Sequence, residues 1–237
     1  MGGGFGSKLY SIAAMKNRKF LFQIFLLPIQ VIFSAQSIYS QTTFQKTYNN
    51  GVPSSFDWGF AVQETLDSNF ITSGSVPSNL KDYGLLKMNR YGAVLWGKAY
   101  GITGKSDVAY SAQQTADLGY IMAGTSYGKL FLVKTNATGA LQWAMTYDSV
   151  VAIPLATPVP PISIHQTSDG GYIVGSSILS YGIQVVFMVK VNATGNLSWA
   201  RKYQSTGFAM RGGSVRQTQD GGYILASTHS GNTGIYA

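Results

Sequence analysis

Short runs of alternating apolar and polar residues make up the chain from Thr42 onward, and turn-forming Asn, Asp, Thr and Gly separate these runs. Alternation with a period of two is typical of a β-strand with one buried face. The intervening Asp-Gly-Gly and Asn-Ala-Thr-Gly segments supply the glycines that tight hairpin turns need at positive φ. The pattern therefore predicts an all-β fold of short strands joined by hairpins.

Two sequence motifs recur in strict alternation. The first, with the form Gln-Thr-x-Asp-Gly-Gly-Tyr-Ile and some variation, occurs four times, and its threonines are spaced by 50, 52 and 51 residues. The second reads LLKMNRYGAVLWGKAY at residues 85–100 and returns at 132–147 and 188–203. The repeat positions that we expect to be structural are Thr65, Thr115, Thr167, Thr218, Asp67, Asp117, Asp169, Asp220, Gly92, Gly139, Gly195, Trp96, Trp143 and Trp199.

Each repeat contains four predicted strands in about 50 residues, which is the size of one blade of a β-propeller. A single blade cannot bury both of its faces, so the copies must stack around an axis. The repeat tryptophans are predicted to be the large wedges between blades. The predicted parts are an outer strand at 42–48, blades at 49–100, 101–147 and 148–203, and a partial blade at 204–237.

Residues 44–48 align with residues 96–100, so the repeat region begins with a lone fourth strand. That strand could complete the last blade of a closed four-bladed ring, or the sequence could belong to a longer propeller. We favour the second arrangement, an incomplete ring, because the third strand of the last blade would otherwise be cut short.

The first 41 residues differ in character. Residues 1–14 fit neither a signal nor a domain, whereas residues 15–41 follow the basic, apolar and small-polar order of a secretory signal peptide. The prediction is a secreted, periplasmic or cell-surface protein. The alternative is an uncleaved membrane anchor at residues 20–33, but this run is about 14 residues long, and a spanning helix needs about 20.

Charge and cysteine content exclude several classes of site. The 17 basic residues outnumber the 9 acidic ones, but four of them lie in the first 41 residues and no basic run follows. Nucleic-acid binding is therefore not predicted. The sequence has no cysteine, which rules out disulfides, thiolate metal sites and cysteine nucleophiles.

The recurring aspartates have two interpretations. They could bind calcium, but Asp before Gly is also a common turn residue. Because one carboxylate per repeat does not form a cluster, we favour the turn and predict no metal site. Asp57 and Asp107 could line one rim of the ring, but we expect both to be loop residues.

The recurring lysines and the two histidines are candidate ligand or catalytic groups. Lys87, Lys134 and Lys190 could surround a channel and attract an anion, but we favour solvent-facing positions with the stems along apolar neighbours. His165 and His229 lie in different repeats, and no nucleophile with an orienting partner is recognisable. His165 is predicted to be a polar strand residue, and no catalytic residue is predicted.

The stretch Lys-x-Asn-Ala-Thr-Gly-x-Leu-x-Trp resembles the repeat of quinoprotein (pyrroloquinoline-quinone) β-propellers, in which a Thr-Gly turn precedes a docking tryptophan. The Gln-Thr-x-Asp-Gly-Gly-Tyr-Ile motif resembles repeats of uncharacterised secreted propellers. The resemblance spans residues 42–237 and implies the fold. It does not extend to the acidic, basic and cysteine residues that contact the quinone, so no cofactor is predicted.

Together these features predict an exported or cell-surface propeller scaffold for a protein or glycan ligand, with no catalytic site. Binding is expected on the loops between the second and third strands, at residues 76–83 and 178–184. One alternative is a propeller enzyme, a quinone-dependent dehydrogenase or a hydrolase, whose catalytic residues lie outside this chain. Another is a membrane-anchored envelope component.

Overall fold

The computed structural model describes residues 44–48, 58–77, 81–152, 161–180, 183–203 and 209–229. By its contacts the chain divides into Met1–Gln41 and Thr42–Ala237, and every described residue belongs to the second unit. The predicted signal peptide and Asp57 therefore lie outside the described residues. Within the described ranges, no helix is long and apolar enough to cross a membrane.

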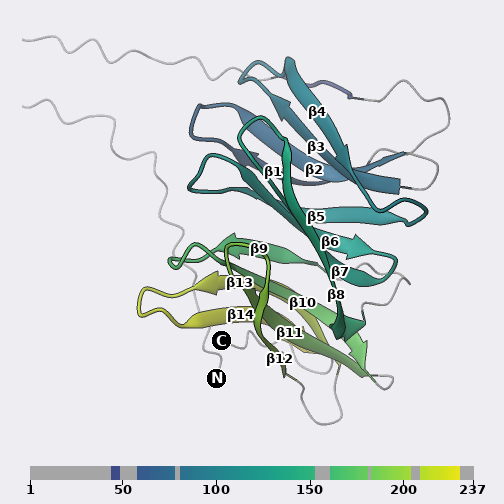
Figure 1. The fold of residues 1–237 in the computed structure, drawn as a ribbon, viewed down its shortest axis with the longest axis vertical. Helices are drawn as coiled ribbons and strands as arrows, with labels where there is room; N and C mark the ends of the chain where they lie inside the picture. The colour runs from purple at the N-terminus through teal and green to yellow at the C-terminus, as the bar shows by residue number, and fades with distance from the viewer. Residues whose placement is uncertain are drawn as a thin grey trace, which may run out of the picture. The chain divides into compact units, whose positions relative to one another are not determined.

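Fourteen strands and no helix are found in the described part of the chain (Figure 1). The first blade contains β1 (Trp58–Glu64), β2 (Phe70–Pro77), β3 (Lys81–Met88) and β4 (Val94–Tyr100). The second contains β5 (Asp107–Gln114), β6 (Tyr120–Ser126), β7 (Lys129–Thr135) and β8 (Leu141–Ala152). The third contains β9 (Ser163–Gln166), β10 (Tyr172–Ser180), β11 (Ile183–Val191) and β12 (Leu197–Tyr203). A fourth sheet contains β13 (Met210–Gln217) and β14 (Tyr223–His229).

Each of the first three blades is a four-stranded antiparallel sheet with its strands paired in chain order. The predicted fold class, an all-β, propeller-like arrangement of four-stranded blades, is confirmed. The repeat period of the sequence and the repeat of the sheets coincide, because the turn between the first and second strands falls on the first motif and the turn between the third and fourth strands falls on the second.

The hydrophobic core lies in the seams between neighbouring blades. On β7, Phe131 and Val133 pack with Tyr83 of the first blade. The alternating residues Leu130 and Leu132 pack with the third blade on the opposite face. Because successive residues of a strand point to opposite faces, this strand is buried on both sides. The second blade therefore depends on both of its neighbours.

The turn between the first and second strands closes in the same way in all four sheets. In the first blade, the Thr65 N–H donates to Asn69 O at 2.8 Å and the Ser68 N–H donates to Thr65 O at 2.9 Å. The fourth turn residue takes a positive φ: 57° at Ser68, 65° at Leu118, 78° at Gly170 and 85° at Gly221. Two of the blades thus place a residue with a side chain where the backbone favours glycine.

Replacing Ser68 by glycine should stabilise the protein by about 0.5–1 kcal/mol. The change removes the left-handed backbone strain of roughly 1–2 kcal/mol, and the larger conformational freedom of glycine in the unfolded chain offsets part of that gain. The measurement is the free energy of unfolding from denaturant titration. The reverse change, Gly170→Ala, is the control. No atom lies within 4 Å of a Cβ at Gly170, so its cost is conformational alone. Destabilisation by Ser68→Gly would contradict the prediction.

Candidate functional site

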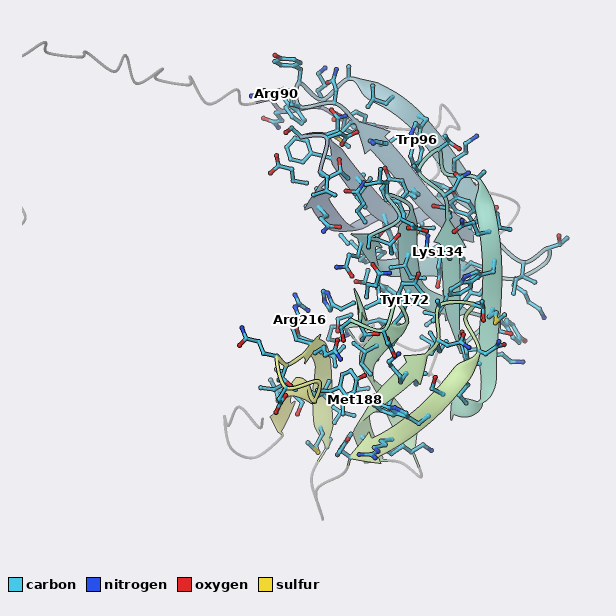
Figure 2. All side chains as sticks on the ribbon, turned by 60° about the vertical axis from the view of Figure 1, so that its left-hand side comes forward. Arg90, Trp96, Lys134, Tyr172, Met188 and Arg216 are labelled. Atoms are coloured by element: carbon cyan, nitrogen blue, oxygen red, sulfur yellow. The ribbon has the colours of Figure 1, made fainter. Side chains whose placement is uncertain are left out.

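The three repeat tryptophans lie in the seams, in matching environments. Each is on the fourth strand of its blade, and its ring contacts a tyrosine on the second strand of the next sheet. The pairs and their ring-centroid distances are Trp96–Tyr120 at 5.7 Å, Trp143–Tyr172 at 5.9 Å and Trp199–Tyr223 at 5.4 Å. The rings are tilted or edge-on, the arrangement that aromatic pairs prefer. These tryptophans therefore join blades. Figure 2 labels Trp96 of the first pair and Tyr172 of the second.

The repeat glycines receive the tryptophan rings at the turn between the third and fourth strands. Gly195 has a φ of 85°, and a Cβ there would come within 2.9 Å of the Trp143 ring. Its carbonyl accepts a hydrogen bond from Tyr147 Oη at 2.5 Å, as the Gly139 carbonyl does from Tyr100 at 2.6 Å. Glycine is required here both for the backbone conformation and for the close approach of the ring.

Residues 44–48 make the same contacts with the first blade. Tyr48 Oη donates to the Gly92 carbonyl at 2.7 Å, and Phe44 lies against Gly92 where a tryptophan lies in later blades. The Phe44 and Phe70 ring centroids are 6.5 Å apart. These residues do not form a β-strand. Residues 44–48 of the predicted outer strand therefore pack against the first blade as a fourth strand does, but they are not part of a β-strand.

The repeat threonine and aspartate form the turn between the first and second strands. Thr65, Thr115, Thr167 and Thr218 each donate their hydroxyl to the aspartate two residues later. Asp117, Asp169 and Asp220 also accept the N–H of the residue that follows the positive-φ position, at 3.0–3.1 Å. In the described residues, no group of three or more His, Cys, Asp or Glu side chains could hold a metal ion.

The solvent-facing position predicted for Lys87, Lys134 and Lys190 is wrong. All three are buried, and each pairs with the repeat aspartate of its blade, at 2.6, 2.8 and 2.9 Å respectively. Lys134 Nζ also donates to Thr135 O at 2.8 Å and to Gln142 Oε1 at 3.0 Å. A buried ammonium is tolerated here because oxygen acceptors satisfy its hydrogen bonds and the aspartate carboxylate balances its charge. Figure 2 labels Lys134 beside the seam.

The ion pairs change the acidity of the aspartates. Hydrogen bonds from Lys190 and Thr167 lower the pKa of Asp169 to about 2. The hydrogen bond from Lys87 likewise holds the pKa of Asp67 well below its usual value. The pKa of Asp117 is also lowered, because the hydrogen bonds from Lys134 and Thr115 outweigh the burial that opposes them. The carboxylates therefore stay charged in moderately acidic solution.

The other predicted polar positions have mixed outcomes. Asp107 is not in a loop: it begins β5 and is fully buried, and its Oδ2 accepts the Ile102 N–H at 2.7 Å. Burial raises its pKa, and the nearby Asp82 carboxylate adds to the rise. His165 lies on β9 as predicted, and its Nε2 contacts Arg216 on β13. Burial and Arg216 lower the pKa of His165 to about 4.

The two segments predicted as variable binding loops are mostly strand. β2 runs to Pro77 and β3 begins at Lys81, and in the third blade the pairing continues to Ser180 opposite Ile183. The residues of these segments extend the hairpins because their backbone groups pair across the two strands. The described residues of both segments are therefore strand residues, and Lys81 and Asp82 lie at the end of the hairpin in the first blade.

Exposed aromatic rings gather near that end of the first two blades, a feature that the sequence analysis missed. We call Trp58, Phe60 and Tyr110 the aromatic row. The ring centroids of Trp58 and Phe60 are 6.0 Å apart, and those of Phe60 and Tyr110 are 4.9 Å apart. Trp58 is 44% exposed and Phe60 is 41% exposed. Phe60 and Tyr110 both precede a repeat glutamine by three residues, which was a signal that could have paired them.

Two lysines lie beside exposed rings in the same region. Lys81 Nζ is 3.8 Å from the centroid of the Trp58 ring, and Lys105 Nζ is 4.4 Å from that of Tyr127. The backbones of Lys81 and Ser106 are bridged, and the Tyr127 N–H donates to Ser106 O at 3.0 Å. The two lysine–ring pairs are thus neighbours, and in each pair the ammonium lies over one face of the ring.

Comparisons with known proteins give little further guidance. No family model and no curated protein matches the chain. It is similar to a solved structure, that of a protein of unknown function from Bacteroides caccae, with a TM-score of 0.49 and 16% sequence identity. The match covers 76% of this chain and 60% of that chain, so this chain spans less than two-thirds of that protein. The resemblance to quinoprotein repeats stays a prediction.

Removing Asp117 and removing Lys134 from the ion pair of the second blade should destabilise the protein by different amounts. Asp117→Asn leaves the buried Lys134 ammonium without its counter-charge and should cost about 1–3 kcal/mol of unfolding free energy. Lys134→Met leaves a half-exposed carboxylate that water can solvate, so it should cost less than about 1 kcal/mol. Thermal and denaturant unfolding of both variants measure the difference. Equal costs would contradict this account of the pair.

The same pair predicts a pH dependence. The folded-state pKa of Asp117 lies below its ordinary value of 3.8, so its charge stabilises the folded protein above that value. This contribution is lost as the pH falls through the folded-state pKa. The difference in unfolding free energy between the wild-type protein and Asp117→Asn should therefore be largest near neutral pH and should shrink in strong acid.

Proposed function

We propose that this protein is an exported or cell-surface scaffold that binds an extracellular ligand at the aromatic row and the adjacent lysines. The observation that carries the proposal is the row itself, in which the exposed Trp58 ring contacts the exposed Phe60 ring and Phe60 contacts Tyr110 on the neighbouring blade. Clustered exposed rings are unusual on a surface that has no partner. The signal-peptide-like N-terminus supports export.

The chemistry of the surface favours a glycan as the ligand, and an acidic one in particular. Flat aromatic faces complement the apolar faces of sugar rings, while Lys81 and Lys105 supply positive charge and hydrogen-bond donors beside them. The rings lie on β1 and β5, and their contacts with one another hold them in place, so little side-chain freedom is lost on binding. A protein ligand, which the sequence alone left equally open, becomes an outcome of the test.

Screening the secreted form of the protein against arrays of neutral and acidic polysaccharides should give saturable binding to an acidic member. The double variant Trp58→Ala/Phe60→Ala should weaken that binding by at least about tenfold, because both ring faces are lost. The matched control is Tyr91→Ala, which removes an exposed ring from the turn between β3 and β4 of the first blade. This variant should bind normally. Affinities are measured by titration calorimetry.

Salt provides an independent measurement. Binding should weaken as ionic strength rises, and Lys81→Gln should reduce that salt dependence. Retention of full affinity by the double variant, or capture of proteins but no glycan in the same screen, would overturn the assignment of a glycan to the aromatic row.

A further inference from the structure

The outer edge of β14 has no strand beside it within the described residues. In the first three blades the second strand, β2, β6 or β10, is paired on both sides. In the fourth sheet, β14 pairs with β13, and no other described strand pairs with its second backbone edge. An open edge is a template for one more strand, and backbone hydrogen bonds would supply the affinity.

The side chains around this edge repeat those of the other blades, but with their partners absent from the described residues. Asp220 accepts hydrogen bonds from Thr218 and Gly222, as its equivalents do from theirs, yet no lysine of the described residues pairs with it. In the other blades that lysine comes from the third strand, directly opposite the repeat isoleucine: Ile71 with Lys87, Ile121 with Lys134 and Ile173 with Lys190. The corresponding position on β14 is Ile224.

Burial gives a second, independent sign. Ile71, Ile121 and Ile173 are fully buried, whereas Ile224 is 41% exposed. Tyr203 is 37% exposed and has no acceptor among the described residues, whereas Tyr147, its equivalent in the second blade, is buried and donates to a turn glycine of the following blade.

We infer that the edge of β14 is an acceptor site for a β-hairpin of the repeat's own type, Leu-Val-Lys-x-Asn-x-x-Gly-x-Leu-x-Trp. Its first strand pairs antiparallel to β14 with the lysine opposite Ile224, and the ammonium reaches Asp220. Its turn glycine lies under the Trp199 ring and accepts the Tyr203 hydroxyl, as Gly195 does with Trp143 and Tyr147. Charge, register, burial and turn geometry all specify the same occupant, and the site is separate from the aromatic row.

The probe is a synthetic peptide with the sequence of residues 132–147, LVKTNATGALQWAMTY, added to the full-length protein and followed by fluorescence anisotropy. Saturable binding is expected, and hydrogen exchange should slow at the β14 amides. A peptide with methionine in place of the lysine should bind about tenfold more weakly, because the charge-assisted hydrogen bond to Asp220 is lost.

The variant Asp220→Asn identifies the register. The lysine and methionine peptides should bind Asp220→Asn with similar affinity, because the carboxylate that distinguishes them is gone. A scrambled peptide is the control for nonspecific association. Absence of saturable binding, absence of protection at β14, or an unchanged preference for lysine in Asp220→Asn would each overturn the inference.

Discussion

The fold depends on the docking of the fourth strand of one blade onto the turn of the next. A tryptophan ring covers a glycine that has no Cβ to resist it, and a tyrosine four residues later donates a hydrogen bond to that glycine's carbonyl. The same ring meets the tyrosine on the next blade's second strand. Because these contacts cross between sheets, a blade isolated from its neighbours would expose rings, turn carbonyls and two apolar faces at once. Stability is therefore a property of the array, as in other repeat proteins.

The buried lysine–aspartate pairs add specificity of register to this hydrophobic docking. Lys134 lies on the same face of β7 as Leu132, and that face packs on the third blade. A one-residue slip would move the lysine to the opposite face and bury its charge without a carboxylate. The pair thus links the two turns at one end of a blade and penalises wrong pairings. We regard this penalty as the reason a charged residue is present in an otherwise apolar strand.

Much of this arrangement could be predicted from the sequence, because the interactions repeat with the chain. Strand number, hairpin turns and the inter-blade position of Trp96, Trp143 and Trp199 follow from period, alternation and glycine spacing. The lysine partners did not follow, since Asp117 and Lys134 are 17 residues apart and only the register of β6 with β7 brings them together. The burial of Asp107 was missed for a similar reason: its surroundings come from Gly101, Ile102 and Asp82, which belong to no repeat motif.

The residues outside the repeat are consequently the ones free to carry function. At the repeat positions, a change of residue removes a contact between blades, so those positions can vary little without loss of the fold. The bulged residue of the first strand differs from sheet to sheet: it is Phe60 in the first blade, Tyr110 in the second and Gly213 in the fourth sheet. A bulge turns a side chain out of the regular pairing. Tyr110 at the second of these bulges also packs against the core between the second and third blades. The Trp58 and Phe60 rings, by contrast, stay 44% and 41% exposed, and for that reason we propose them, rather than the seam residues, as the ligand contacts.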